Sequence, residues 1–215
     1  MIKYHTKVNQ SKKEGVQVNN INPKILEALE KNNNVITTSK IESLGFSKQL
    51  LSKYVKSGLL LRMNQGVYTL PNVVQDDMYS LMLRSSYIVF SHESSLFLNQ
   101  LSNRTPFIHS ITLPSDKSIS RSIKSDCICF YVKPELYQIG ITMKKNTFGN
   151  TIRCYDSERT ICDLLRTRKR CDEEVVVYAL KNYACSEQKD LNKLASYAKL
   201  FKVDTDIKRY MEVLL

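Results

Sequence analysis

A short polar segment near the N-terminus carries side chains that are suited to duplex DNA. Gln49 can form a pair of hydrogen bonds with adenine, Lys48 can reach guanine, and Ser52 can bond to either base. Lys53 and Lys56 lie further along the segment and are better placed for phosphate groups. If the segment is a helix, its N-terminal part would face the bases. The predicted contact residues of this segment are Ser47, Lys48, Gln49, Ser52, Lys53 and Lys56.

Two neighbouring segments extend this predicted surface. Residues 37–39 begin a preceding helix, whose free N–H groups and hydroxyls suit a phosphate. Residues 62–65 form a hairpin tip that can enter the adjacent minor groove. The predicted contact residues here are Thr37, Thr38, Ser39, Arg62, Asn64 and Gln65, and Lys3, Lys7, Lys12 and Lys13 can add non-specific phosphate affinity. A merely solvated surface and a protein-docking surface are the alternative interpretations.

Helix caps and breakers predict the elements that position these side chains. Asn22 followed by Pro23 predicts one helix start. A second start lies at residues 37–39, where Ser39 and Glu42 have capping-box spacing, although either threonine could also cap. A short extended pair, Val35 and Ile36, lies between the two helices.

The next residues predict a turn, a third helix and a hairpin. Gly45 ends the second helix in a left-handed turn, and Ser47 begins a helix that runs to about Ser57. Residues 59–63 and 67–70 have strand composition, and Gly66 is placed for a positive φ between them. The order of helix, strand, helix, glycine turn, helix and hairpin predicts a winged helix-turn-helix.

Residues suited to catalysis lack the arrangements that an enzyme needs. Ser91 and His92 are adjacent but lie outside a GxSxG elbow, and a histidine beside a helix cap is more often a structural hydrogen-bonding group. His109 is isolated in the sequence. The Glu-Gln-Lys sequence at 187–189 resembles half of a nuclease motif, but it lies at a predicted helix start. Without a Walker loop or GxGxxG motif, we predict no catalytic residue and no enzyme.

The cysteines do not form a recognisable metal site. All six lie between Cys127 and Cys185, and none belongs to a CxxC knuckle or a zinc-finger quartet. We therefore predict reduced thiols, no metal and no cofactor.

Charge and hydropathy favour a polyanion partner and a cytoplasmic location. The 215-residue chain has a net charge of +11 and 42% hydrophobic residues. Residues 1–70 contain eleven Lys/Arg and four Asp/Glu, a net charge of +7, which favours nucleic acid or a membrane surface as partner. No apolar run approaches the roughly 18 residues of a membrane span, and the N-terminus lacks the apolar core of a signal peptide.

The remainder of the chain predicts an α+β domain that ends in a run of helices. Helices are expected near 78–85, 91–101 and 157–167, with strands at 87–91, 107–113, 127–132 and within 144–156. The last third predicts three helices, within 172–184, 187–201 and 206–215. The predicted domains are a flexible basic arm at 1–21, the winged helix-turn-helix at 22–71 and the α+β domain at 76–215.

A second basic set lies in this α+β region. Its residues form either a solvated surface or a surface for a polyanion or acidic partner. Arg159 is instead predicted to be internal and paired with Asp156 or Asp163. The surface candidates are Lys144, Lys145, Arg153, Arg166, Arg168, Lys169 and Arg170.

The segment VITTSKIESLGFSKQLLSKYVKSGLLLRMNQGVYTLP resembles the N-terminal winged helix of AbiEi-type antitoxins of bacterial abortive-infection systems. Its marks are Gly45 in the turn, Lys56 with Gly58, and the Gly-Val-Tyr of residues 66–68. SHESSLFLNQLSN, ITLP at 111–114 and DSERTICDLLR resemble further motifs of the family, in the same order. The N-terminal arm is longer than the family pattern, and Ser95 stands where alanine is usual.

The resemblance implies an antitoxin that represses its own toxin–antitoxin promoter and counters a nucleotidyltransferase-like toxin in phage defence. Such systems are usually of type IV, in which direct contact with the toxin is not required. The implied partner is double-stranded DNA with inverted repeats upstream of the operon, bound cooperatively by a chain that can be monomeric in solution. The Ser91-His92-Ser94 and Arg159-Thr160-Asp163 segments match family motifs whose role the residues alone do not give.

Two other functions fit parts of the pattern. A nuclease could use a winged helix to hold its substrate, although an acidic metal-binding cluster on strands is missing from the sequence. A protein-docking adaptor could use the basic surfaces to bind an acidic partner.

Overall fold

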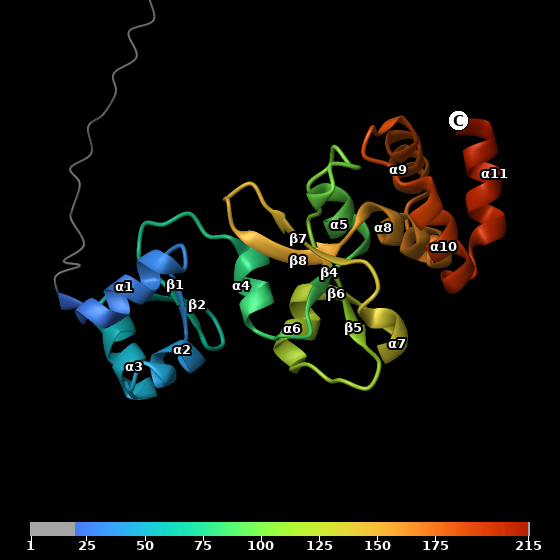
Figure 1. Ribbon diagram of the computed structural model, residues 1–215. Coiled ribbons are helices and arrows are strands. Elements are labelled where there is room, and N and C mark those ends of the chain that lie inside the picture. The colour runs from blue at the N-terminus through green and yellow to red at the C-terminus, as the bar shows by residue number, and fades with distance from the viewer. Residues whose placement is uncertain (1–19, 215) are drawn as a thin grey trace, which may run out of the picture. The chain divides into compact units, whose positions relative to one another are not determined.

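The computed structural model describes residues 20–214, and the predicted basic arm, with Lys3, Lys7, Lys12 and Lys13, lies outside them except for its last two residues. The chain divides into two compact units, one up to Val74 and the other from Gln75 (Figure 1). We call them the first and second units. None of the helices in the described part has the length and apolar run needed to cross a bilayer.

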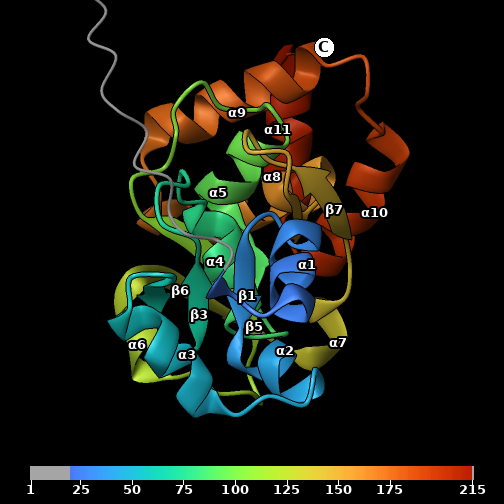
Figure 2. The ribbon, with the colours of Figure 1, turned by 90° about the vertical axis from the view of Figure 1, so that its left-hand side faces the viewer.

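The first unit is a winged helix-turn-helix, as predicted. Its three strands form an antiparallel sheet in the order β1-β3-β2, and Figure 2 shows α1 beside β1. The elements are α1 (Pro23–Lys31), β1 (Val35–Thr37), α2 (Thr38–Ser43), α3 (Lys48–Lys56), β2 (Leu61–Asn64) and β3 (Val67–Thr69).

Local signals and a small core explain these elements. The Asn22 side chain accepts a hydrogen bond from Lys24 N at 3.0 Å and caps α1, and Pro23 occupies the first helical position. Tyr54 of α3 accepts a hydrogen bond from Asn22 N at 3.0 Å through its hydroxyl. The buried core side chains include Ile25, Leu29, Ile36, Ile41, Leu51 and Leu60.

Of the candidate caps of α2, Thr37 is the one used. Its Oγ1 accepts a hydrogen bond from Lys40 N at 3.2 Å. The predicted capping box of Ser39 and Glu42 is wrong, since Ser39 lies within α2. The reason is the sheet: Thr37 pairs with Val67 and keeps the backbone extended up to that residue.

The second unit is α+β and ends in helices, as predicted. Its five-stranded sheet has the order β6-β5-β4-β8-β7. The pairs β5–β6 and β4–β8 are parallel, whereas β4–β5 and β7–β8 are antiparallel. The strands are β4 (Val89–Phe90), β5 (His109–Pro114), β6 (Cys127–Val132), β7 (Ile141–Lys145) and β8 (Thr151–Tyr155).

Helices cover this sheet and form a second core at the C-terminal end. Met78 and Leu81 of α4 and Ile123 of α6 pack with the sheet residues Ile111 and Ile152. The helices are α4 (Asp77–Leu83), α5 (His92–Leu98), α6 (Arg121–Asp126), α7 (Pro134–Tyr137), α8 (Ser157–Arg166), η2 (Arg168–Arg170), α9 (Glu173–Cys185), α10 (Leu191–Phe201) and α11 (Asp204–Leu214).

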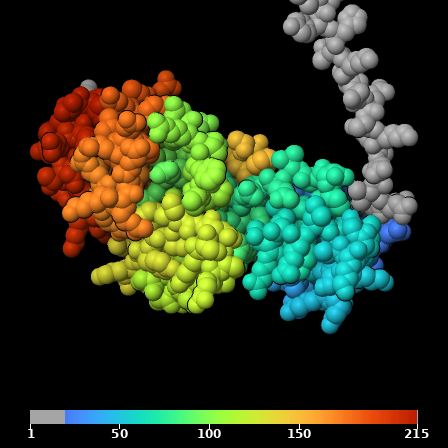
Figure 3. All heavy atoms as spheres, turned by 180° about the vertical axis from the view of Figure 1, so that it is seen from behind, coloured from blue at the N-terminus to red at the C-terminus, as the bar shows by residue number. Residues whose placement is uncertain are grey.

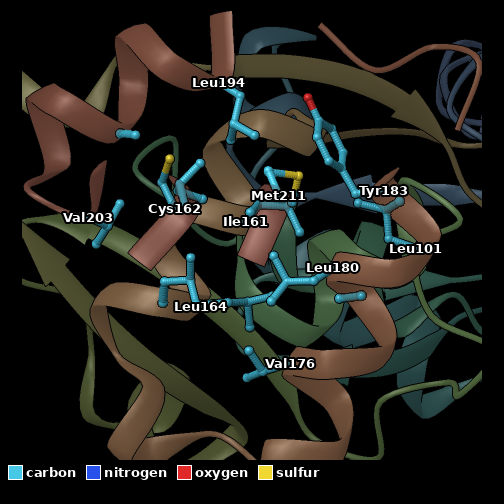
Figure 4. Close-up of a cluster of buried hydrophobic side chains, with 14 of the residues drawn as sticks. Leu101, Ile161, Cys162, Leu164, Val176, Leu180, Tyr183, Leu194, Val203 and Met211 are labelled. Carbon is cyan, nitrogen blue, oxygen red and sulfur yellow. The ribbon is translucent and has the colours of Figure 1, made fainter. Parts of the chain in front are cut away.

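The C-terminal core brings together α8, α9, α10 and α11, with Leu96 of α5 beside them. Figure 4 shows Ile161 and Leu164 of α8 together with Leu180 of α9, Leu194 of α10 and Met211 of α11. Burial of these side chains ties the helical end of the chain to α8, because each fully buried aliphatic side chain contributes roughly 1.5–3 kcal/mol.

Several predicted boundaries shift in the second unit. The strand expected from residue 107 begins at His109, and Phe107 is fully exposed. The strand or hairpin expected within 144–156 is the pair β7 and β8. The short helices α6 and α7 were not predicted.

Candidate nucleic-acid interface and buried motif residues

One face of α3 is entirely polar and exposed. Residues 48, 49, 52, 53 and 56 are exposed, and at about 100° per residue they fall within one side of a helix. Leu51 and Tyr54 occupy the opposite side and are buried in the core. Figure 3 shows the α3 segment, in cyan, at the surface of the first unit. The exposed face consists of Lys48, Gln49, Ser52, Lys53 and Lys56.

This face has the size and charge of a groove-binding element. With a rise of about 1.5 Å per residue, the eight steps from Lys48 to Lys56 span about 12 Å, close to the width of the DNA major groove. The face carries three lysines and no acidic residue. Over residues 20–74, seven Lys/Arg and three Glu give a net charge of +4, so the basic excess remains without the N-terminal arm.

The start of α3 carries one ion pair that sequence reasoning missed. Lys48 Nζ lies 3.2 Å from Glu42 Oε1 of α2, and both side chains are about half exposed or more. An exposed pair of this kind contributes little to stability. Ser47 occupies the N-cap position of α3 and is exposed, but its side chain makes no capping hydrogen bond. Its hydroxyl is therefore not used within the cap.

The wing turn and the start of α2 are tied together. Thr38 N donates a hydrogen bond to Gly66 O at 2.9 Å, and Gly66 has a φ of +76°. The predicted contact residues of α2 and of the wing thus belong to one connected surface. Thr37 and Thr38 are half-buried there, whereas Ser39, Arg62 and Gln65 are exposed.

Arg62 and Asn64 lie at an irregularity of the wing. The register between β2 and β3 shifts between these two residues, and Arg62 Nε is 3.4 Å from Asn64 O.

Lys40, an exposed residue of α2, is absent from the predicted surface. Its position one residue after Ser39 would have been the signal for including it.

The second basic set does not form a uniform exposed surface. Arg153 donates hydrogen bonds to the carbonyl oxygens of Ser86 and Ile88. Arg166 is only 28% exposed and lies 3.4 Å from Asp163, and Arg168 pairs with Glu173. Lys144 is half-buried. Exposed members of the set are Lys145, Lys169 and Arg170.

Arg159 is internal and paired with Asp163, which confirms that prediction. Its Nε donates to Asp163 Oδ2 at 2.9 Å, and the two side chains are 0% and 1% exposed. Nη1 donates to the carbonyl oxygens of Leu136 and Ile139, both at 2.7 Å. The guanidinium also lies over the rings of Tyr155 and Phe201, at 4.1 and 4.0 Å from their centroids. This arginine connects α8 with the segment around α7 and with α10.

Thr160 and three serines join α8 to α5 and β5. Thr160 Oγ1 donates to Asp156 O at 2.6 Å and lies 2.9 Å from Ser95 Oγ. Ser95 Oγ donates to His92 O at 3.1 Å. Ser94 Oγ accepts a hydrogen bond from Ser110 N at 2.9 Å. The Ser-His-x-Ser and Arg-Thr-x-x-Asp motifs are therefore buried connections between elements.

His92 is a buried, neutral part of this arrangement. Its ring stacks on Phe130 with centroids 3.5 Å apart, and Nδ1 lies 3.0 Å from Ser91 Oγ. Burial, together with the charges of Arg166, Arg159 and Arg170, lowers the pKa of His92 to about 3. A neutral imidazole 1% exposed to solvent suits packing rather than proton transfer with a substrate.

Within residues 20–214, no group of three or more His, Cys, Asp or Glu residues is arranged to hold a metal ion.

Comparisons with known proteins agree with the fold of the first unit. Residues 23–71 match the family model described as "Transcriptional regulator, AbiEi antitoxin". No curated protein sequence matches the chain significantly. Among solved structures, that of the RV2827C protein from Mycobacterium tuberculosis is similar, with a TM-score of 0.52 and 9% identity over 87% of this chain and 79% of that chain. At this identity the similarity shows the fold alone. The winged-helix segment of residues 23–71 is thus similar to the AbiEi antitoxin family of transcriptional regulators.

Proposed function

We propose that the chain is a DNA-binding antitoxin that represses its own toxin–antitoxin promoter through the first unit. The observation that carries this proposal is the exposed face of α3, which places three lysines, a glutamine and a serine on one side of a helix-turn-helix. The match of residues 23–71 to AbiEi transcriptional regulators supports it.

In this proposal α3 enters the major groove and its N-terminal residues read the bases. Lys48 contacts guanine, Gln49 contacts adenine and Ser52 contacts either base. Lys48 can leave Glu42 for DNA at little cost, because an exposed ion pair is worth less than about 1 kcal/mol. Lys53 and Lys56 contact phosphates.

The wing and the start of α2 contact the flanking backbone. Arg62, Asn64 and Gln65 approach the minor groove, while Ser47 and residues 37–39 lie against phosphates. The hydrogen bond between Thr38 N and Gly66 O keeps these two segments at a fixed spacing. The operator is a pair of inverted repeats upstream of the operon, and two monomers bind it cooperatively.

The second unit supplies the antitoxin activity against a nucleotidyltransferase-like toxin, in phage defence by abortive infection in the cytoplasm. In this proposal it performs no catalysis. The Ser91, His92 and Arg159 motifs are buried and hydrogen-bonded within the unit, which suits a structural role. Lys145, Lys169 and Arg170 are the exposed members of its basic set and are the proposed surface for a polyanion or for the toxin.

The direct test compares operator binding by the wild-type chain and by the variant Lys48→Ala/Gln49→Ala. Fluorescence anisotropy with the native upstream duplex should show a loss of about 1–3 kcal/mol per base contact. Lys31→Ala removes one exposed positive charge from α1, outside the proposed surface, and is the matched control. Equal affinities of the wild type and a folded double variant would refute the assignment of α3 as the recognition helix.

The division of labour between the units is tested in cells that express the toxin. A chain that lacks residues 1–71 should lose repression of a promoter–reporter fusion and keep its protection against the toxin. Loss of protection by this truncated chain, at matched expression and with intact second-unit folding, would contradict the proposal.

A further inference from the structure

Two cysteine side chains meet on one side of strand β6. Cys127 and Cys129 are two residues apart, so their side chains point to the same face of the sheet. Their Sγ atoms are 3.6 Å apart. β6 is an edge strand that pairs with β5 alone within the five-stranded sheet. The two thiols therefore lie on a strand that is held by hydrogen bonds to one neighbouring strand, not two.

The surroundings place the proton on Cys127. Its Sγ lies 2.9 Å from the carbonyl oxygen of Ile123, which disfavours a thiolate at that sulfur. The hydrogen bond from Cys127, aided by the charge of Lys124, lowers the pKa of Cys129 to about 7. The same hydrogen bond and burial raise the pKa of Cys127. Cys129 is thus the thiolate of the pair near neutral pH.

Cys129, the thiolate of the pair, is also the more accessible of the two side chains to solvent. Cys129 is half-buried, whereas Cys127 is 7% exposed. Burial raises the pKa of both Cys154 and Cys162 to about 12, so these thiols remain protonated and inert. Cys185 is exposed and serves as a comparison. A thiolate that is partly exposed and has a second thiol in contact is the arrangement found at oxidation-sensitive cysteines.

We propose that Cys127 and Cys129 form a modification site for hydroperoxides, in which Cys129 is oxidised first and Cys127 resolves the product. The Cys129 thiolate attacks the terminal oxygen of a hydroperoxide. An S–O bond forms, the O–O bond breaks, and the alkoxide or hydroxide leaves and takes up a proton. The Cys127 sulfur then attacks Cys129 Sγ, an S–S bond forms, and water leaves with the Cys127 proton. Two thiols are oxidised and one peroxide is reduced.

Closing this disulfide must change the edge strand. Residues two apart in a strand have Cα atoms about 6.6–6.8 Å apart, at the upper end of the range for disulfides. Cys129 is followed directly by Phe130, whose ring stacks on that of His92 with centroids 3.5 Å apart and lies 4.5 Å from the Arg170 guanidinium. A shortened β6 would therefore move the Phe130 ring, against which the Arg170 guanidinium lies. Arg170 is one of the exposed basic residues of the second unit.

The experiment treats the reduced full chain with hydrogen peroxide and identifies the products by peptide mass spectrometry. The wild type should lose two hydrogen atoms as a Cys127–Cys129 disulfide, reversible by dithiothreitol. Cys127→Ser should instead accumulate a dimedone-reactive sulfenic acid at Cys129, whereas Cys129→Ser should leave Cys127 unmodified. Cys185→Ser should behave as the wild type.

A second measurement needs no variant. The rate of iodoacetamide alkylation of Cys129 in the folded wild type should reach half its maximum near pH 7, rather than at about 8.5 as for an ordinary cysteine. The proposal is overturned if Cys129 stays reduced in peroxide while Cys185 is oxidised. It is also overturned if Cys129 alkylation has its midpoint at the ordinary value.

Discussion

The buried pair of Arg159 and Asp163 gives a prediction whose size can be worked from the structure. Replacing Arg159 with methionine keeps a flexible apolar stem among Tyr155 and Phe201 but removes the charge. The Asp163 carboxylate, 1% exposed, then loses the donor at 2.9 Å. Two carbonyl oxygens, on the half-buried residues Leu136 and Ile139, also lose theirs.

Removing one partner of a buried ion pair costs about 3–5 kcal/mol, because the remaining charge stays away from water. Arg166 Nη2 remains 3.4 Å from Asp163 Oδ1 and offsets part of this cost. We therefore expect a loss of about 3 kcal/mol for Arg159→Met, at the lower end of that range. Burial already raises the pKa of Asp163 in the folded chain. Loss of Arg159 would raise it further, so the destabilisation should be smaller at pH 5 than at pH 7.

Hydrogen exchange of the α8 amides measures this local stability without assuming that both units unfold together. Lys208→Met is the matched control, because Lys208 and Glu212 have the same spacing along a helix but are exposed and 3.8 Å apart. It should leave protection unchanged. The double variant Arg159→Met/Asp163→Leu should recover part of the loss. Unchanged protection of α8 in Arg159→Met would refute the structural role of this motif.

Two further changes test other parts of the molecule. Burial lowers the pKa of His92 to about 3, so the unfolded chain binds the extra proton and stability should fall below about pH 6.5, by up to about 1.4 kcal/mol per pH unit. His92→Asn should make hydrogen-exchange protection of α5 less dependent on pH between 7 and 5, and an unchanged slope would contradict a neutral buried His92. Gly66→Ala should destabilise the wing by about 1–2 kcal/mol, because φ is +76° and a Cβ would meet Thr38 Oγ1 at 3.4 Å. Unaltered exchange in β2 and β3 would contradict this.

The first unit could be predicted from sequence because its signals are local. Asn22 with Pro23 marks a helix start, Gly45 adopts the left-handed turn with a φ of +84°, and the alternation of Leu51 and Tyr54 with polar residues fixes the orientation of α3. The cap of α2 could not be predicted with the same certainty. Three polar residues in a row were available, and the choice of Thr37 depends on pairing with β3, which lies thirty residues away in the chain.

The second unit was less predictable because long-range contacts decide its details. The helices α6 and α7 have six and four residues, too few to produce a periodic pattern. The parallel pairing of β4 with β8 joins segments that nothing local connects. The internal position of Arg159 was predictable from its spacing to Asp163, but its carbonyl partners near α7 were not. Composition alone also could not separate the paired arginines of the basic set from the exposed Lys169 and Arg170.

The central proposal is that the first unit binds duplex DNA through the cationic face of α3. Its most direct test is equilibrium binding of the full chain to its native upstream duplex over a series of salt concentrations. The proposal predicts a preference over an unrelated duplex. It also predicts that the logarithm of the binding constant falls linearly with the logarithm of salt concentration, because each lysine on a phosphate releases about one counterion. A chain that ignores its upstream duplex at low ionic strength, or binds both duplexes equally, would contradict it.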